Sequence, residues 1–243
     1  IANGALYALT QDNQLFAIDQ TNGQVQWAAS GTLETQGVFG VGAPAVSQGS
    51  IVTGYSSGEL SAYRYENGRV LWQDALSRTS VSISVSSLAD IDASPVIDNG
   101  RVYAVGEGGR MVALELSTGQ RLWEQNFAGI STPWIAGEWL FVVTDDARLV
   151  CLARTTGKAR WIAQLPRYGN EKKRSDPVIW YGPVLAGNRL VLTNSRGEIA
   201  YVSPTDGSVQ QTIEVGGAFT LPPIVANQTL YTLDEAGTIA AYR

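Results

Sequence analysis

The chain has 243 residues, 44% of them hydrophobic and 16% charged, and its net charge is −5. This composition supports a folded core rather than a disordered chain, and the acidic balance argues against a nucleic-acid partner, which usually requires a clustered basic face. The chain has no histidine, the commonest metal ligand and general base, and its one cysteine, Cys151, cannot form an intrachain disulfide or a thiolate metal cluster.

The N-terminal residues already follow the repeated pattern described next. Ile1–Tyr7 lack the basic, apolar and small-residue zones of a signal peptide, so we expect any targeting segment to lie outside this sequence. No run of about 18 apolar residues occurs in the chain, and the sequence therefore predicts no membrane-spanning helix.

One short pattern recurs five times, at intervals of about 40 to 50 residues. In its clearest copy, residues 113–123, a β-rich run is followed by a turn with a glycine and by a second run with a tryptophan. The other copies span residues 17–27, 62–72, 151–161 and 201–211. Helical repeats of this length would show apolar residues at i, i+3, i+4 and i+7, whereas these units show short β-rich runs. The period therefore predicts an all-β fold, the β-propeller of four-stranded antiparallel blades.

The unit around the clearest copy can be divided into four strands. The first three are expected at Ser94–Asp98, Arg101–Val105 and Arg110–Glu115, and the fourth at Gln120–Glu124. Asn99-Gly100, between the first two, is the strongest short hairpin signal.

The last of six recognisable units is incomplete. Its strands are expected at residues 222–225, 229–233 and 238–242, without an outer fourth strand. A propeller closes its ring when a strand from one terminus completes the blade at the other, which removes exposed edges. We therefore expect residues 1–243 to form a single β-propeller domain that is the C-terminal part of a longer ring.

Four of the five copies carry a tryptophan four residues after the turn glycine. These are Trp27, Trp72, Trp123 and Trp161, and the fifth copy has Gln211 instead. We interpret the tryptophans as wedges between adjacent blades, because burying one removes about 150–250 Å² from water. The junction after the fifth copy is then expected to be the loosest.

Small residues dominate the position six before each turn glycine. The residues there are Ala17, Ala62, Ala113, Cys151 and Tyr201. We expect a crowded site at this position, where neighbouring sheets approach. Cys151 is then a small apolar substitute for alanine. The alternative, a reactive thiol, has no histidine to activate it.

Three long connections, residues 31–45, 73–93 and 165–177, each join a fourth strand to the next first strand. Such connections emerge from one face of a propeller, and binding residues concentrate on loops held by a rigid scaffold. The basic run Lys172–Arg174 is either a solvated loop tip or a contact for lipid headgroups or an acidic partner. Trp180, beside this loop, is a secondary binding candidate if it is exposed.

Two carboxylates, Asp90 and Asp92, precede the first strand of the clearest unit. At i and i+2 on an extended chain they face the same side. They can cap a turn, bind a basic group of a partner or contribute to a metal site, although two oxygen ligands are too few for calcium.

The alanine, the threonine-glycine turn and the tryptophan of each copy resemble the PQQ-type propeller repeat over essentially the whole chain. Quinoprotein dehydrogenases of that type would add a vicinal cysteine pair, a calcium site and a catalytic aspartate. One cysteine excludes the pair, and no acidic and amide residues show calcium-site spacing. We therefore expect no cofactor, no metal and no catalytic residue.

Two loops and the C-terminal segment resemble the BamB family of propeller lipoproteins. The matching segments are Ser82–Pro95, the glycine-rich Gly37–Pro44 one blade earlier, and Gly237–Arg243. The resemblance implies an eight-bladed ring whose first blades, about two, and lipidated cysteine lie outside this sequence. It also implies a non-enzymatic scaffold of the β-barrel assembly machinery, docked on the POTRA region of BamA at the periplasmic face of the outer membrane of a Gram-negative bacterium.

The same resemblance assigns the partner-binding residues. Asp90 and Asp92 occupy the family's acidic Asp-x-Asp position. Val38 and Phe39 stand where the family carries a leucine-rich segment with an arginine. The apolar character is kept but the arginine is absent, which puts the detailed charge pairing in doubt. Phe39 is either an exposed hydrophobic anchor or a residue folded back over the core.

The sequence thus favours a scaffold in outer-membrane protein assembly. Unfolded outer-membrane proteins are a further candidate partner, and membrane contact is expected only through an N-terminal lipid anchor outside this sequence. Two alternatives remain. One is a fragment of a PQQ-dependent quinoprotein dehydrogenase, and the other is a periplasmic propeller that binds peptide or carbohydrate.

Overall fold

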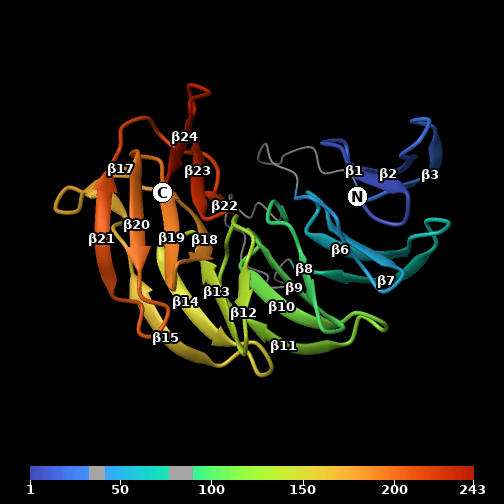
Figure 1. The fold of residues 1–243 in the computed structure, drawn as a ribbon. Coiled ribbons are helices and arrows are strands. Elements are labelled where there is room, and N and C mark those ends of the chain that lie inside the picture. Colours follow the sequence, from blue (N-terminus) through green and yellow to red (C-terminus); the bar gives the residue numbers. More distant parts are fainter. Residues whose placement is uncertain (33–41, 77–89) are drawn as a thin grey trace. The chain divides into compact units, whose positions relative to one another are not determined.

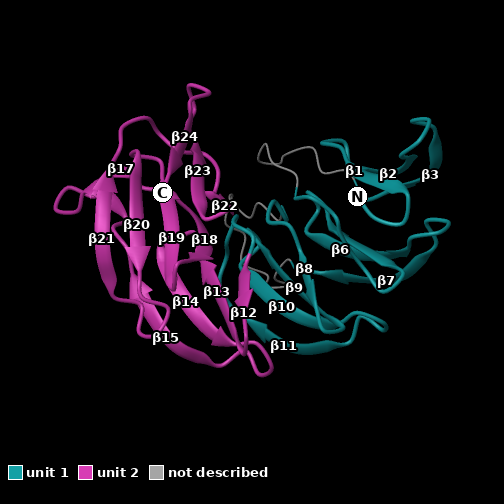
Figure 2. Ribbon diagram, in the orientation of Figure 1, with its two compact units in different colours: residues 1–132 teal, residues 133–243 magenta. Residues whose placement is uncertain are grey.

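A computed structural model describes residues 1–32, 42–76 and 90–243 (Figure 1). Regular structure in these residues consists of β-strands, and none of them belongs to a helix that could cross a membrane. The chain falls into two compact units, Ile1–Thr132 and Pro133–Arg243, which are coloured separately in Figure 2.

The first unit contains three antiparallel sheets of consecutive strands. The first sheet has β1 (Ala5–Leu9), β2 (Gln14–Asp19) and β3 (Val25–Ser30). The second has β4 (Ala45–Ser47), β5 (Ser50–Gly54), β6 (Glu59–Arg64) and β7 (Val70–Ala75). The third has β8 (Val96–Asp98), β9 (Arg101–Gly106), β10 (Arg110–Glu115) and β11 (Arg121–Gln125).

The second unit repeats this arrangement and adds a small hairpin. Its first sheet has β12 (Trp134–Ala136), β13 (Trp139–Val143), β14 (Arg148–Ala153) and β15 (Ala159–Gln164). The hairpin is β16 (Tyr168–Asn170) and β17 (Ser175–Pro177). The next sheet has β18 (Trp180–Ala186), β19 (Arg189–Asn194), β20 (Glu198–Val202) and β21 (Val209–Glu214). The last has β22 (Ile224–Ala226), β23 (Thr229–Leu233) and β24 (Ile239–Tyr242).

These sheets confirm the predicted four-stranded antiparallel units. The last sheet lacks a fourth strand, as the sequence predicted, and the first sheet also has three strands. Sequence and structure differ by two residues at β8, which begins at Val96 rather than Ser94. The reason is that the Ser94 N–H donates to the Thr132 hydroxyl, at 3.2 Å, and so does not join the ladder.

The sheets that carry the five copies of the repeat each have one row of residues in register across three neighbouring strands. In three blades this row is an aromatic ring, a small residue and a tryptophan, and the two rings lie 5.9–6.1 Å apart. The rows are Tyr7–Ala17–Trp27, Tyr103–Ala113–Trp123 and Phe141–Cys151–Trp161. The small residue is therefore crowded from within its own blade, since the two rings come together over it. It also packs in a core shared with the next sheet, as Cys151 does with Leu192 and Ala200.

The tryptophan then reaches the next sheet. Trp72 donates its indole N–H to the Leu116 carbonyl at 2.7 Å, from the second sheet to the third. Beneath the ring is Gly119, whose backbone has φ +73°, and a Cβ there would lie 2.6 Å from the indole. The turn glycine thus permits both a left-handed turn and close contact with the ring. Trp27 and Trp161 make equivalent bonds, to the Tyr65 carbonyl at 2.9 Å and the Pro204 carbonyl at 3.1 Å.

In the fifth copy the large side chain of the row is on the third strand and the smaller one on the fourth. Val191, Tyr201 and Gln211 occupy the three positions, so the large ring has moved from the fourth strand to the third. A cavity of about 330 Å³ lies between this sheet and the last one, lined in part by Tyr201, Arg189 and Tyr242. The missing indole therefore coincides with incomplete packing at the junction that was expected to be the loosest.

Cys151 occupies the small position of its row. It is fully buried, and burial raises the pKa of its thiol to about 11. The thiolate is the reactive form of cysteine. The side chain is therefore inert near neutral pH and serves as packing.

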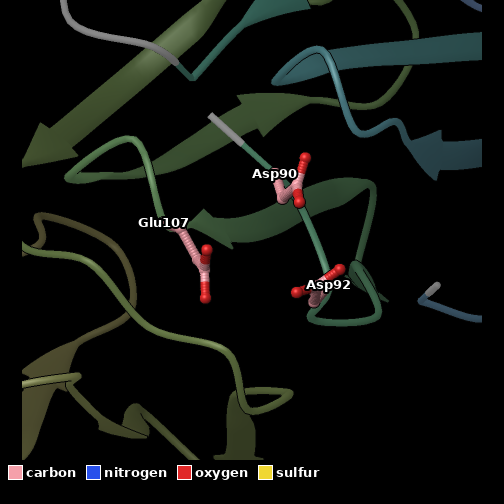
Figure 3. Close-up of side chains that lie close together, drawn as sticks. All are labelled: Asp90, Asp92 and Glu107. Atoms are coloured by element: carbon pink, nitrogen blue, oxygen red, sulfur yellow. The ribbon is translucent and has the colours of Figure 1, made fainter. Parts of the chain in front are cut away.

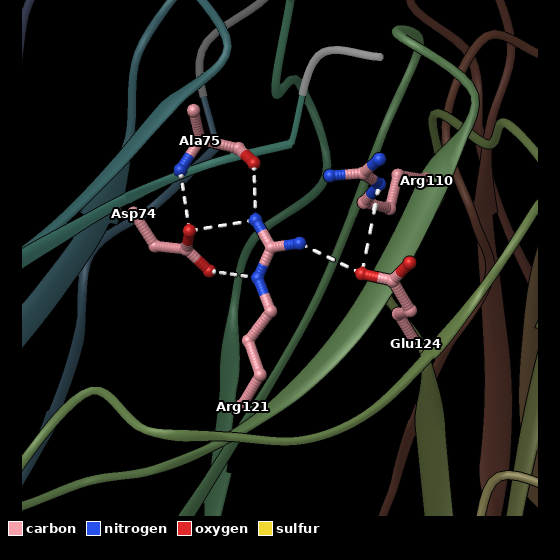
Figure 4. A network of polar contacts seen from close by, with 5 residues as sticks. All are labelled: Asp74, Ala75, Arg110, Arg121 and Glu124. Carbon is pink, nitrogen blue, oxygen red and sulfur yellow. Dashed lines mark hydrogen bonds and ion pairs between the residues drawn. The ribbon is translucent and has the colours of Figure 1, made fainter. Parts of the chain in front are cut away.

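A polar network links the outer strands of the second and third sheets (Figure 4). The Arg121 guanidinium donates to both oxygens of Asp74, at 2.6 and 2.7 Å, and to the Ala75 carbonyl at 2.7 Å. It also donates to Glu124 at 2.7 Å, and Arg110 lies 3.9 Å from that carboxylate. Hydrogen bonds to Asp74 raise the pKa of Arg121. This forked geometry holds β7 against β11 where the chain leaves the second sheet.

The indole contacts generate a stability prediction. Replacing Trp72 by alanine should lower the free energy of unfolding by about 3–5 kcal/mol, because it leaves a cavity between two sheets and removes the donor of the Leu116 carbonyl. Urea denaturation followed by circular dichroism measures the change. Trp134, which is 37% exposed on β12, is the matched control and its alanine variant should lose much less. Equal losses in both variants would contradict the inter-sheet role.

Candidate partner-binding site

The acidic pair lies on an extended segment that enters β8. Ile91, between the two aspartates, is 3% exposed and packs in the core of the second and third sheets with Val52 and Leu76. Its N–H donates to the Tyr55 carbonyl at 3.3 Å. The buried isoleucine therefore anchors the segment between two blades and fixes the positions of Asp90 and Asp92 on either side of it.

Three glycines make room for this segment. A Cβ at Gly54, the last residue of β5, would collide with the Ile91 side chain. One at Gly106, the last residue of β9, would lie 3.2 Å from the Asp90 carbonyl oxygen. One at Gly42 would lie 2.8 Å from the Ala93 carbonyl oxygen. Glycine is needed at these three positions because a Cβ would be too close to the neighbouring atoms, and not because the backbone has a positive φ.

A third carboxylate joins the pair (Figure 3). Carboxylate oxygens of Asp90, Asp92 and Glu107 all lie within 4.8 Å of one another. Glu107 opens the turn after β9, and its N–H donates to the Asp90 carbonyl at 2.8 Å. Sequence reasoning missed Glu107, because its side chain meets the aspartates only when the segment crosses the end of β9. The available signal was a single acidic residue in the glycine-rich turn Gly106–Gly109.

Burial differs within the cluster. Asp90 is fully buried, whereas Asp92 and Glu107 are partly exposed. Burial, followed by the charge of Asp90, raises the pKa of Asp92 to about 6. The site therefore holds neighbouring carboxyl groups that are incompletely solvated. A basic group brought into contact with Asp92 and Glu107 would relieve that cost.

A metal ion is the other chemistry open to these oxygens. Asp90, Asp92 and Glu107 are the described residues that could hold one. Calcium takes six to eight oxygen ligands, usually including backbone carbonyls and waters. Carboxylates with partly exposed edges equally fit a lysine or arginine side chain of a partner.

The companion loop can be followed only in part. Val38 and Phe39 lie outside the described residues, so their predicted role stays a prediction. The end of their loop reaches the acidic segment, because the Ala43 N–H donates to the Ser94 hydroxyl at 2.9 Å. The structure thus brings the end of the glycine-rich loop beside the Asp-x-Asp segment, as a shared binding surface requires.

The secondary candidate is not exposed. Trp180 is 4% exposed, and its indole N–H donates to the Pro166 carbonyl at 2.9 Å. It packs with Val178 in the core of the second unit. The suggestion that Trp180 forms a binding surface is therefore wrong, because the ring anchors the preceding loop instead.

Sequence comparison matches the chain to one family. The profile described as outer membrane protein assembly factor BamB matches residues 1–163. The assembly factor BamB of Yersinia pestis is 26% identical over an alignment of 244 positions, which covers 100% of this chain and 60% of that protein. That of Escherichia coli K12 is 28% identical over 204 residues, 82% of this chain and 49% of that protein. The chain therefore spans about half to three fifths of the length of these relatives.

Solved structures show the same fold. BamB from Moraxella catarrhalis superposes with a TM-score of 0.85 and 18% identity, covering 100% of this chain and 70% of that one. A europium-containing methanol dehydrogenase superposes with a TM-score of 0.75 and 13% identity, covering 96% and 60%. These similarities establish the β-propeller fold predicted from the repeat, while the eight-bladed ring stays a prediction.

The raised pKa of Asp92 generates a pH prediction. A carboxyl group with a pKa of 3.8 in the unfolded chain and about 6 in the folded protein binds more protons when folded. Stability should therefore fall as the pH rises from about 4 to about 6. Asp92→Asn should raise the urea midpoint at pH 7 and change it little at pH 4. Glu66→Gln, an exposed control, should follow the wild-type profile. A lower midpoint for Asp92→Asn at pH 7 would contradict the assignment.

Proposed function

The chain belongs to the BamB family, and from this premise we propose that it acts as a non-catalytic scaffold of the β-barrel assembly machinery. In this proposal the longer protein that contains the chain works at the periplasmic face of the outer membrane and is held there by an N-terminal lipid. Its partner is the POTRA region of BamA, with unfolded outer-membrane proteins as a further candidate.

The observation that carries the proposal is the acidic cluster. Asp92 and Glu107 present partly exposed carboxylates beside the buried Asp90. A partner lysine or arginine placed there would favour the charged form of Asp92 and reverse the cost that raises its pKa. Binding would then be favoured because it removes a free-energy cost, that of ionising the partly buried Asp92, which the free protein already bears.

The scaffold around the cluster suits a docking surface. Ile91 locks the segment in the core and the Arg121–Asp74 fork holds the neighbouring strands, so the acidic groups lose little freedom on binding. Preorganisation of this kind raises affinity by lowering the ordering cost. Val38 and Phe39, on the loop that ends beside Ser94, would supply the apolar part of the contact.

An enzymatic alternative comes from the fold neighbours. The similarity to a methanol dehydrogenase has 13% sequence identity and concerns the fold alone. The single cysteine of the chain excludes the vicinal cysteine pair of quinoprotein dehydrogenases. Activity after reconstitution with PQQ and calcium would support this alternative and contradict the scaffold proposal. A peptide- or carbohydrate-binding propeller is the other alternative.

The docking proposal predicts the effect of charge reversal. In the longer protein, Asp92→Lys and Glu107→Lys should each weaken binding to the isolated POTRA region of BamA by at least about tenfold, equivalent to about 1.4 kcal/mol, because like charges then meet. Calorimetric titration measures the affinity. Both side chains are partly exposed, so the substitutions spare the buried Asp90. Asp206→Lys, in an exposed turn of the second unit, is the control and should bind as the wild type does.

The same titration has a pH dependence. Wild-type affinity should fall as the pH drops below about 6, because Asp92 then becomes neutral. Asp92→Asn should bind more weakly at pH 7 and lose most of this dependence. Unchanged affinity of both lysine variants at pH 7 would overturn the assignment of this site.

A further inference from the structure

The β16–β17 hairpin belongs to the second unit and is hydrogen-bonded at its base. Its strands pair Tyr168 with Pro177 and Asn170 with Ser175. At the base, the Val178 N–H donates to the Arg167 carbonyl at 2.8 Å. The buried indole of Trp180 anchors the approach to it through the Pro166 carbonyl. The loop that the sequence left open as a solvated tip or as a contact for lipid headgroups or an acidic partner therefore forms a hairpin with defined geometry.

The acidic side chains of the hairpin are used internally. One Glu171 oxygen accepts the N–H groups of Arg167 and Tyr168, at 2.8 and 3.2 Å. Asp176 forms an ion pair with Arg196, which lies in the turn after β19. Gly169 is required at this point, because a Cβ there would collide with both partners of the ion pair.

The basic side chains at the tip of the hairpin, in contrast, have no ion-pair partner among the described residues. Lys172, Lys173 and Arg174 are all exposed, and none forms an ion pair with another residue in the described part of the chain. The Lys173 N–H donates to the Asn170 side chain at 3.0 Å, which fixes the tip. Arg174 and Asp176 adopt φ of 49° and 66°, a left-handed conformation that is costly for residues other than glycine. The fold therefore places three adjacent cations at an exposed tip, and one of them, Arg174, has a costly backbone conformation.

We propose that this hairpin is a second docking surface, which binds an acidic segment of a protein partner. The hairpin carries the opposite charge to the site of Asp92 and Glu107, so it would bind a different group of a partner. It also belongs to the other compact unit. The proposal goes beyond the function given above, because it concerns a separate contact of opposite charge. Arg174 supplies a planar fork that matches a carboxylate, and the two neighbouring lysines add positive charge.

A membrane fits this surface less well. Residues 169–176 contain no large apolar side chain that could enter a bilayer. Three cations near an anionic surface contribute about 1 kcal/mol each, and lipid-binding basic clusters usually have four to eight. Nucleic acid is also disfavoured, because the aromatic ring of the hairpin, Tyr168, is half-buried and already stacks with the Arg167 guanidinium, and the chain carries a net charge of −5.

Photo-crosslinking in the assembled complex tests the proposal. The crosslinker p-benzoylphenylalanine at the exposed Ser175, in the longer protein, should give adducts with peptides that contain at least two aspartates or glutamates, identified by mass spectrometry. Reversing the tip charges with Lys172→Glu, Lys173→Glu and Arg174→Glu together should reduce the yield at least tenfold. The variant Arg64→Glu, Arg69→Glu and Lys158→Glu changes the net charge equally at exposed sites elsewhere and should retain the yield.

A milder variant gives the opposite result. Glu171→Gln keeps an oxygen for the two backbone donors and removes one negative charge, so it should increase the yield about twofold. Adducts with peptides that lack acidic residues, or an equal loss in both triple variants, would overturn the proposal. So would binding to vesicles of phosphatidylethanolamine and phosphatidylglycerol, at 3:1, that disappears when the tip is reversed. Asp92→Lys should leave the Ser175 adducts in place, which separates a failure of this surface from a failure of the acidic site.

Discussion

Contact between an indole and a turn glycine is the constraint on which the rest of the structure depends. A blade of three or four short strands cannot bury both faces alone, so it is stable only against its neighbours. Trp72 meets this need by lying on Gly119 and bonding to the Leu116 carbonyl, and Trp161 does the same at Gly207. At these junctions an indole fills the space between two neighbouring sheets. Because the sheets are packed together in this way, the ends of the loops that they carry are held in place.

The acidic site shows how such a framework shifts the chemistry of a loop. Ile91 fills the space between two sheets, and glycines at 42, 54 and 106 let the backbone pass close by. The chain then holds Asp92 partly out of water and next to Asp90, so that burial, followed by the charge of Asp90, raises the pKa of Asp92. A flexible loop with the same sequence would relax. Burial of the Ile91 side chain thus contributes to the raised pKa of the neighbouring residue Asp92.

The repeat, most strands of the blades and the fold class could be predicted from the sequence, because they follow from local patterns. The hairpin of β16 and β17 was not predicted, since residues 165–177 were expected to form a connection. Asn99-Gly100 marks a hairpin, and the alanine–glycine–tryptophan spacing marks a propeller blade. The participation of Glu107 could not be predicted, since it depends on where one segment crosses the end of a strand. Trp180 was misjudged for a similar reason: its charged neighbours in sequence suggested exposure, whereas its neighbours in space are apolar.

The row of three residues across each blade constrains how the repeats can diverge. Where the fourth strand carries tryptophan, the facing residue of the third strand is Ala17, Ala62, Ala113 or Cys151, and where it carries Gln211 the facing residue is Tyr201. Enlarging the small partner alone would overpack the row, and shrinking the indole alone would leave a void. Neither change is well tolerated without the other. The effect of a substitution at one position of a row thus depends on the residue at the other position. A mutational path from a small residue facing tryptophan to tyrosine facing glutamine therefore passes through a pair of intermediate size rather than through either single substitution.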